Sequence, residues 1–294
     1  MATKRKSKRT KKQFNIIATV AFVAIILIVA IVYYFFVPKN DATNKNSEYT
    51  KLPQVVYGDL INDFKVHFVD VDKGDGIIIQ LPNGQNMLVD AGDNKTASIN
   101  KLTNYIDSLG ITTFDYLIAT HSDADHIGGM PTIFERYQIN YVYRPYMYSS
   151  HAQAANFPEG FNQGSTRSSY SCSTQIYYRF LQCIIDEGSG WSFFNKDSDI
   201  SFEFKDENEV NYTCTFDFLT PTADISDISY KSNMNNYSPI IKVSYCDYDI
   251  LLTGDAEKEA EEELLEYYSD LNYLDVDLLK VGHHGSDTSS TTAF

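Results

Sequence analysis

Four short apolar runs in this sequence each end in a turn that carries aspartate or histidine. The polar residues of these turns are Asp90 after MLV, His121, Asp123, Asp125 and His126 after YLIA, Asp255 after DILLT, and His283 and His284 after DLLKV. Apolar runs of this length are typical of buried strands. Because strand ends at one edge of a sheet commonly form sites, we expect these side chains to converge.

The residue types in the four turns are those that bind divalent metal ions. Zinc and similar ions take imidazole nitrogen and carboxylate oxygen as ligands at about 2.0–2.2 Å. Each motif alone has an ordinary structural explanation, since D-A-D is common in turns and one histidine at a strand end is usually structural. Four of the six histidines, however, fall in two of the turns. Together the turns predict a metal site, in which Asp255 could bridge two ions.

Short strands and helices alternate along the rest of the chain. The predicted strands are 66–71, 77–81, 87–89, 116–119, 141–143, 216–219, 240–245 and 250–252, and the predicted helices are 99–109, 175–187 and 257–268. This mixture predicts an α/β (α+β) fold with a sheet-on-sheet core and helices outside. Residues 144–174 interrupt the pattern, and we expect this insert to border the substrate site.

The N-terminal part of the chain predicts a membrane anchor. Residues 1–13 are basic, and residues 14–37 are almost wholly apolar. At about 1.5 Å per residue, that segment exceeds a hydrocarbon core of roughly 30 Å. A cleaved signal peptide is the alternative, but its apolar region is shorter, at about 7–15 residues. Since basic residues mark the cytoplasmic side, we expect a single-pass protein of the cell membrane with a cytoplasmic N-terminus, a linker over 38–57 and an extracellular domain over 58–294.

Charge limits the partners of that domain. Residues 1–12 hold seven of the 24 basic residues and no acidic residue, so 17 basic residues face all 39 acidic residues in the remainder. An acidic surface repels nucleic acid and attracts cations. Nucleic acid is therefore a disfavoured partner, and a phosphate substrate requires a metal ion or a local basic side chain.

The four cysteines are Cys172, Cys183, Cys214 and Cys246. They form no C-x-x-C pair, which argues against a structural zinc ribbon. We expect buried free thiols, with a Cys172–Cys183 disulfide as the alternative outside the cell.

Five motifs in order carry a family resemblance: F-V-D-V-D-K-G-D-G, M-L-V-D-A-G, H-S-D-A-D-H-I-G-G, L-L-T-G-D-A-E and L-K-V-G-H-H-G-S. Over about residues 64–294 they resemble the metallo-β-lactamase-fold hydrolases, and more narrowly the ComEC/Rec2-related branch, akin to the outer domain of the DNA-uptake channel. The resemblance implies an αββα sandwich. The ligands that it implies are His121, Asp123, Asp125, His126, Asp255 and one of His283 and His284, with His284 the better ligand. Asp90 would orient a ligand from behind, and His283 would face the substrate.

The sequence departs from the family pattern at several points. Asp123 stands where the commoner H-x-H-x-D-H motif has a second histidine, and the separate mid-chain histidine has no counterpart. Both changes weaken one metal position, so we expect one or two Zn²⁺ ions, with a loose or harder second ion such as Mn²⁺ as the alternative. Asp75 and Lys280 are expected beside the site, as supports or substrate contacts, although a hairpin turn and a solvated lysine explain them equally well. The branch continues past H-H-G-S, so the domain is expected to be incomplete at its C-terminus.

These observations lead to one principal hypothesis and two alternatives. The principal hypothesis is a membrane-anchored extracellular hydrolase that attacks a phosphoester, as a phosphodiesterase or nuclease-like enzyme. Catalytic roles are expected for Asp123, which could hold the attacking water, for Asp125 and for His283. The alternatives are a lactonase or β-lactamase-type acyl hydrolase and a non-catalytic metal-binding surface module associated with DNA uptake.

Overall fold

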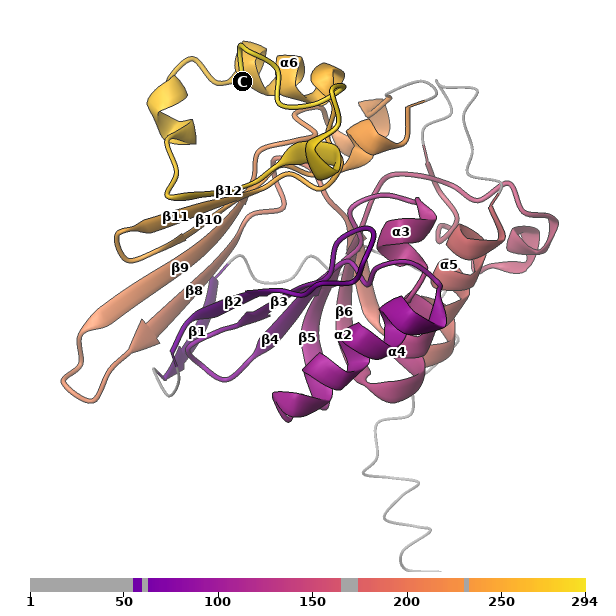
Figure 1. Ribbon diagram of the computed structural model, residues 1–294, viewed down its shortest axis with the longest axis horizontal. Coiled ribbons are helices and arrows are strands. Elements are labelled where there is room, and N and C mark those ends of the chain that lie inside the picture. The colour runs from indigo at the N-terminus through magenta and orange to yellow at the C-terminus, as the bar shows by residue number, and fades with distance from the viewer. Residues whose placement is uncertain (1–54, 60–62, 165–173, 230–232) are drawn as a thin grey trace, which may run out of the picture. The chain divides into compact units, whose positions relative to one another are not determined.

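The computed structural model describes residues 55–59, 63–164, 174–229 and 233–294. The predicted basic segment and membrane span lie outside these ranges, as does most of the linker, so all three stay predictions. No helix within the described ranges is long and apolar enough to cross a membrane. Two six-stranded sheets form the centre of the described domain (Figure 1).

The first sheet contains six strands in the order of the sequence. They are β2 (Lys65–Phe68), β3 (Ile77–Gln80), β4 (Asn86–Val89), β5 (Thr113–Ile118), β6 (Gln138–Arg144) and β7 (Gly190–Phe193). β2, β3 and β4 pair antiparallel, whereas β4 to β7 pair parallel. Because parallel pairing needs long crossovers, the intervening segments contain α2 (Thr96–Ser108), α3 (Ala124–Ile127), α4 (Met130–Arg136) and α5 (Gln175–Glu187). The turns after β4 and β5 consequently meet at one edge.

The second sheet has the order β1-β8-β9-β10-β11-β12. Its strands are β1 (Val55–Asp59), β8 (Ile200–Lys205), β9 (Asn211–Phe218), β10 (Ile241–Tyr245), β11 (Tyr248–Leu252) and β12 (Leu278–Lys280). β8 to β11 pair antiparallel, and β12 pairs parallel to β11 after a crossover through α6 (Lys258–Tyr267) and the 3₁₀ turn η4 (Leu271–Leu274). The turns after β11 and β12 therefore also lie at one edge.

Three apolar layers hold the domain together. Between the sheets, alternate residues of β8 and β9, such as Phe202 and Phe216, pack against Tyr116 of β5 and are buried. A second layer joins the first sheet to α2, α4 and α5, and a smaller third layer joins α6 to β11. Helices thus cover the outer face of each sheet (Figure 1). The predicted layered α/β fold is confirmed, in the order helix, sheet, sheet, helix.

Helix α5 shows how the sequence specifies these elements. Its buried residues Tyr177, Phe180, Leu181 and Ile184 have the spacing of a single helical face. The hydroxyl of Thr174 accepts a hydrogen bond from the Tyr177 amide at 3.2 Å and caps the N-terminus. The predicted range of 175–187 agrees with the structure.

Several boundaries differ from the predictions. Val55–Asp59 forms β1, so the linker predicted over 38–57 ends before Val55. The strands β7 and β8 were not predicted. Of the described cysteines, Cys183, Cys214 and Cys246 are free thiols, but only Cys214 is buried, so the prediction of burial is wrong for the exposed Cys246. Cys172 lies outside the described residues. The short 3₁₀ turn η1 (Ala152–Asn156) is the regular element described within the 144–174 insert.

Candidate metal centre

Turns from both sheets bring histidine and aspartate to one place. His121 follows β5, and His126 lies on the short helix α3 that begins three residues later. Asp255 lies in the turn after β11, and His284 lies in the 3₁₀ turn η5 (Gly282–Gly285) after β12. The predicted convergence of the four turns is therefore present in the structure.

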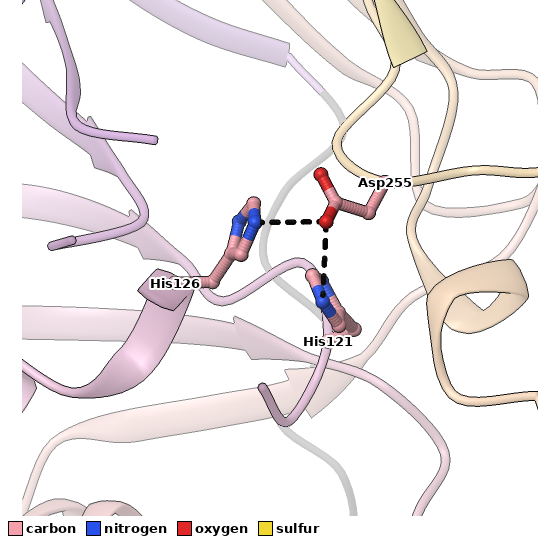
Figure 2. Close-up of side chains that lie close together, drawn as sticks. All are labelled: His121, His126 and Asp255. Atoms are coloured by element: carbon pink, nitrogen blue, oxygen red, sulfur yellow. Dashed lines mark ion pairs between the residues drawn. The ribbon is translucent and has the colours of Figure 1, made fainter. Parts of the chain in front are cut away.

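Three buried residues form the centre of the site. The Nε2 atoms of His126 and His121 lie 3.2 and 3.9 Å from the same oxygen of Asp255, Oδ2. Figure 2 shows the two imidazoles turned towards that carboxylate. One ligand atom from each of the three residues falls within a group spanning at most 4.8 Å, so one cation could be bound by all three.

A second group adjoins the first and shares His126. Nε2 of His284 lies 3.1 Å from Nε2 of His126, 3.2 Å from Oδ1 of Asp255 and 3.8 Å from Oδ2 of Asp125. Asp125, His126 and His284 again place ligand atoms within 4.8 Å of one another. The described residues therefore offer a second candidate cation position, which shares His126 with the first.

Asp90 supports His126 from behind. Its buried carboxylate accepts hydrogen bonds from His126 Nδ1 at 2.6 Å and from the amide and hydroxyl of Thr120 at 2.9 and 2.6 Å. Because Nδ1 donates to Asp90, Nε2 is the ring atom that faces the site. Asp90 itself adopts a φ of 56°, a left-handed conformation that aspartate tolerates. Its expected role of orienting a metal ligand stays a prediction.

Thr120 also determines which nitrogen of His121 is available to a ligand. Since the Thr120 hydroxyl donates to Asp90, its oxygen is left to accept from His121 Nδ1, 3.0 Å away. The Ser238 hydroxyl lies 3.2 Å from the same nitrogen. Nε2 of His121 is then the unprotonated ring atom. Burial lowers the pKa of His121 well below its ordinary value, so the imidazole is neutral, as a metal ligand must be.

The polar atoms at the centre fit a cation. Among the described residues, His121 Nε2 and Asp255 Oδ1 are buried without a hydrogen-bond partner, and such atoms are costly unless a ligand satisfies them. Burial opposes ionisation of Asp255, yet the adjacent His126 and His284 imidazoles hold the pKa of its carboxyl well below the usual range. The carboxylate is therefore charged at the point where the imidazoles meet.

Asp123 and His283 lie at the more open side of the centre. The side chain of Asp123 is 36% exposed, and its Oδ2 lies 3.9 Å from His121 Nε2. Burial and the nearby Asp125 raise the pKa of Asp123. His283 points Nε2 towards Asp255 Oδ2 at 3.8 Å, while its Nδ1 lies 3.0 Å from Glu257 Oε1. Neither residue belongs to the two groups described above, so their predicted roles stay predictions.

Lys280 and Asp75 support the centre from the side of the β2–β3 loop. The ammonium group of Lys280 lies 2.8 Å from Asp75 and donates to the carbonyl of Gly254 at 2.7 Å. The Lys280 side chain is only 10% exposed. These contacts hold the ammonium group in place, and the predicted roles of Lys280 and Asp75 stay predictions. Asp75 Oδ1 also faces His284 Nδ1 at 3.8 Å.

Four contributors to the site were not predicted from the sequence. They are Lys73, Thr120, Ser238 and Glu257. Ser238 was noted only as part of N-N-x-S, yet its hydroxyl also accepts from the Asp255 amide at 3.1 Å. Asn235 donates to Glu257 at 2.7 Å, so the same motif braces the carboxylate next to His283. The motif itself was a usable signal, whereas nothing in the local sequence marks Thr120.

The comparisons with known proteins agree with the geometry. Residues 69–202 match the model of the metallo-beta-lactamase superfamily. Among curated proteins it is similar to ComE operon protein 3 of Bacillus subtilis (strain 168), with 24% identity over 254 residues. That match covers 81% of this chain but only 28% of the relative. The resemblance read from the five motifs is confirmed.

Two further matches are weaker or shorter. A 57-residue segment, 19% of this chain, is 46% identical to 7% of the uncharacterized protein YcaI of Escherichia coli (strain K12). The chain therefore spans much less than half the length of both curated relatives. A solved metallo-beta-lactamase mutant from Cronobacter sakazakii is 15% identical, with a TM-score of 0.37 over 73% of this chain and 75% of that one.

Proposed function

We propose that this chain is a membrane-anchored, extracellular, metal-dependent hydrolase that cleaves phosphoester bonds, as a phosphodiesterase or nuclease-like enzyme. The observation that supports it most is the convergence of His121, His126 and Asp255, in which the buried Nε2 of His121 has no hydrogen-bond partner among the described residues. The anchor is residues 14–37, and the basic segment before it places the domain outside the cell.

The donor atoms suggest which ions the centre holds. Two imidazoles and a carboxylate suit Zn²⁺ at the position formed by His121, His126 and Asp255. The position with Asp125 and His284 also accepts a harder ion such as Mn²⁺. A divalent ion bound there would lower the pKa of a water molecule and polarise the bond to be cleaved.

The protein's own residues supply the remaining chemistry. Asp123 is partly exposed and has a raised pKa, so its carboxylate is suited to orient the attacking water and accept its proton. His283 is oriented by Glu257 and points Nε2 into the centre, from where it can transfer a proton to the leaving oxygen. Asp90 keeps His126 in the required tautomer.

A phosphoester is proposed over an acyl substrate for two reasons. The five motifs resemble the ComEC/Rec2-related branch rather than β-lactamases. In addition, Asp123 stands where the commoner motif has a histidine. The acidic surface favours small phosphodiesters over long nucleic acids, because polyanions would be repelled.

The proposal is tested with the full chain purified in detergent and loaded with Zn²⁺ or Mn²⁺. We expect hydrolysis of bis-p-nitrophenyl phosphate and no hydrolysis of nitrocefin or a lactone. Asp125→Ala should lower the rate at least about a hundredfold, whereas Asp63→Ala, which alters an 87% exposed side chain, should not. Cleavage of nitrocefin or lactone alone would favour an acyl hydrolase.

The excess of acidic residues favours a second candidate, a non-catalytic metal-binding surface module. Stoichiometric metal without turnover on any of these substrates, and with Asp125→Ala equal to wild type, would support that candidate over the enzyme.

A further inference from the structure

The loop between β2 and β3 lies directly against the turn that carries the predicted ligands. Gly74, in this loop, has a φ of 89°, and a Cβ at that position would overlap the carbonyl oxygen of Asp125. The next residue, Asp75, accepts a backbone hydrogen bond from Gly92 at 2.8 Å. The loop is thus fixed on both sides, and the residue before Gly74 is placed at the edge of the centre.

That residue is Lys73, whose ammonium group lies 3.1 Å from Oδ2 of Asp125. The Lys73 side chain is 67% exposed, whereas that of Asp125 is 14% exposed. Lys280, the other lysine near the centre, is largely buried and bonded to Asp75 and Gly254. Of these two lysines, Lys73 is therefore the one whose ammonium group can change partners.

Asp125 contacts both Lys73 and the second metal-binding group. Its Oδ2 pairs with Lys73 and also lies 3.8 Å from His284 Nε2, within the second metal-binding group. A divalent ion bound by Asp125 would compete with Lys73 for the same carboxylate. An ion pair with an exposed lysine is weak, so a divalent ion would displace the ammonium group from Asp125.

An anionic substrate needs positive charge, and the described side chains at this edge are mostly acidic. Asp75, Asp123, Asp125 and Asp255 all face the centre, and the whole chain has a formal net charge of −15. Lysine is a common phosphate-binding residue because its ammonium is a compact charge on a flexible stem. The ammonium group of Lys73 contacts Asp125, and most of its side chain is exposed to solvent.

We propose that Lys73 is the residue that binds the substrate's anionic oxygen, and that it competes with the metal for Asp125. When a divalent ion takes Asp125, the ammonium group pairs with a phosphoryl oxygen instead. This role rests on the proposed function, since it assumes a metal-loaded site and a phosphoester substrate. It makes Lys73 a determinant of specificity for anionic over neutral esters.

The first test measures binding of inorganic phosphate to the metal-loaded full chain by calorimetry. Lys73→Met should weaken phosphate binding about tenfold, because a charge-assisted hydrogen bond is lost. Lys73→Arg should retain most of the affinity. Lys95→Met is the matched control, since that side chain is 72% exposed and pairs with Asp93, outside both groups.

The second test measures metal affinity by competition with a chromophoric chelator and needs no turnover. Lys73→Met should bind Mn²⁺ or Zn²⁺ about two- to fivefold more tightly, because the competing ammonium is removed. Lys73→Arg should resemble wild type, and unchanged thermal midpoints would show that all variants fold.

The outcomes separate the two proposals. A wild-type chain that binds metal and phosphate, with both affinities unchanged in Lys73→Met, overturns the role of Lys73 and leaves the metal centre standing. A wild type that binds metal but no phosphate also overturns that role. A wild type that takes up no metal overturns the proposed function itself, and the role of Lys73 with it.

Discussion

At the scale of single residues, Asp90 links the two motif turns of the first sheet. It accepts hydrogen bonds from His126 and Thr120, and Thr120 in turn sets the tautomer of His121. One carboxylate therefore orients both histidines of the H-S-D-A-D-H motif, one directly and one through a hydroxyl.

Replacing Asp90 by asparagine should weaken metal binding by about 10–100-fold, as is usual for groups that orient a ligand. The amide can still accept from Thr120 but no longer offers a charged acceptor to His126 Nδ1. The affinity is measured by chelator competition on the full chain. Asp63→Asn, at an exposed carboxylate, is the control, and equal affinities for the two variants would contradict the assigned role.

The histidines and aspartates of the centre were predictable because each follows an apolar run that ends in a turn. Their partners were not, because the contacts join distant parts of the chain. Ser238 lies 117 residues from His121, and no local pattern relates them. Likewise, the choice between His283 and His284 depends on left-handed backbone conformations, with φ of 43° and 53°, that sequence spacing does not specify.

At the scale of elements, the β2–β3 loop shows how backbone packing sets the site. Gly74 and Gly110 both have positive φ, at 89° and 70°, but only the Cβ at position 74 would meet other atoms. Gly74→Ala should therefore destabilise the fold by about 2 kcal/mol or more, whereas Gly110→Ala should cost only the strain of the left-handed conformation, about 1 kcal/mol. Urea unfolding measures both, and equal losses would show that the loop does not press on Asp125.

The start of β8 offers a test of electrostatics away from the metal. Desolvation of the Asp199 carboxyl raises its pKa to about 6, and the nearby Asp217 and Asp197 add to the shift. The folded chain thus holds this proton more tightly than the unfolded chain, so stability should fall as pH rises from about 4 to about 6. Asp199→Asn keeps an acceptor for the Phe218 amide and removes the charge.

We expect Asp199→Asn to stabilise the protein at pH 7, because it removes a charge that the fold disfavours. The side chain is exposed and its charge is screened by solvent, so the gain is at most about 1 kcal/mol. The measurement is the free energy of unfolding at pH 4 and pH 7. Asp206→Asn is the control of opposite sign, since hydrogen bonds from the Val210 and Asn208 amides lower the pKa of Asp206. A gain in stability for both variants would refute the electrostatic explanation.

The missed strands show where local patterns are too weak. β8 alternates apolar and polar residues, with Ile200, Phe202 and Phe204 buried, so a search for continuous apolar runs misses it although alternation is itself a strand signal. β7 is four residues long and, among the described strands, pairs with β6 alone. The formation of β7, in contrast, depends on β6, which lies about 50 residues earlier in the chain.

At the scale of the whole molecule, the metal centre lies where the two sheets meet. His121 and His126 belong to the edge of the first sheet, whereas Asp255 and His284 follow β11 and β12 of the second. The interior between the sheets is apolar and is built largely from β8, β9 and β10 against β3 to β6. At the edge, apolar packing gives way to carboxylates and imidazoles, and a cation shared by these groups would connect the sheets.

This arrangement makes folding stability depend on the ion. A ligand that binds only the folded chain stabilises it by about 2.7 kcal/mol at a hundred times its Kd. We therefore expect EDTA to lower the thermal midpoint and added Zn²⁺ or Mn²⁺ to restore it. On removal of the metal, hydrogen exchange should accelerate most in β11, β12 and the turn with His284. The ligands from the second sheet, Asp255 and His284, follow these two strands. Asp255→Asn should abolish the difference between the two conditions, whereas Asp63→Asn should retain it. If chelation changed neither the midpoint nor exchange at these strands, the ion could not be acting as a link between the sheets.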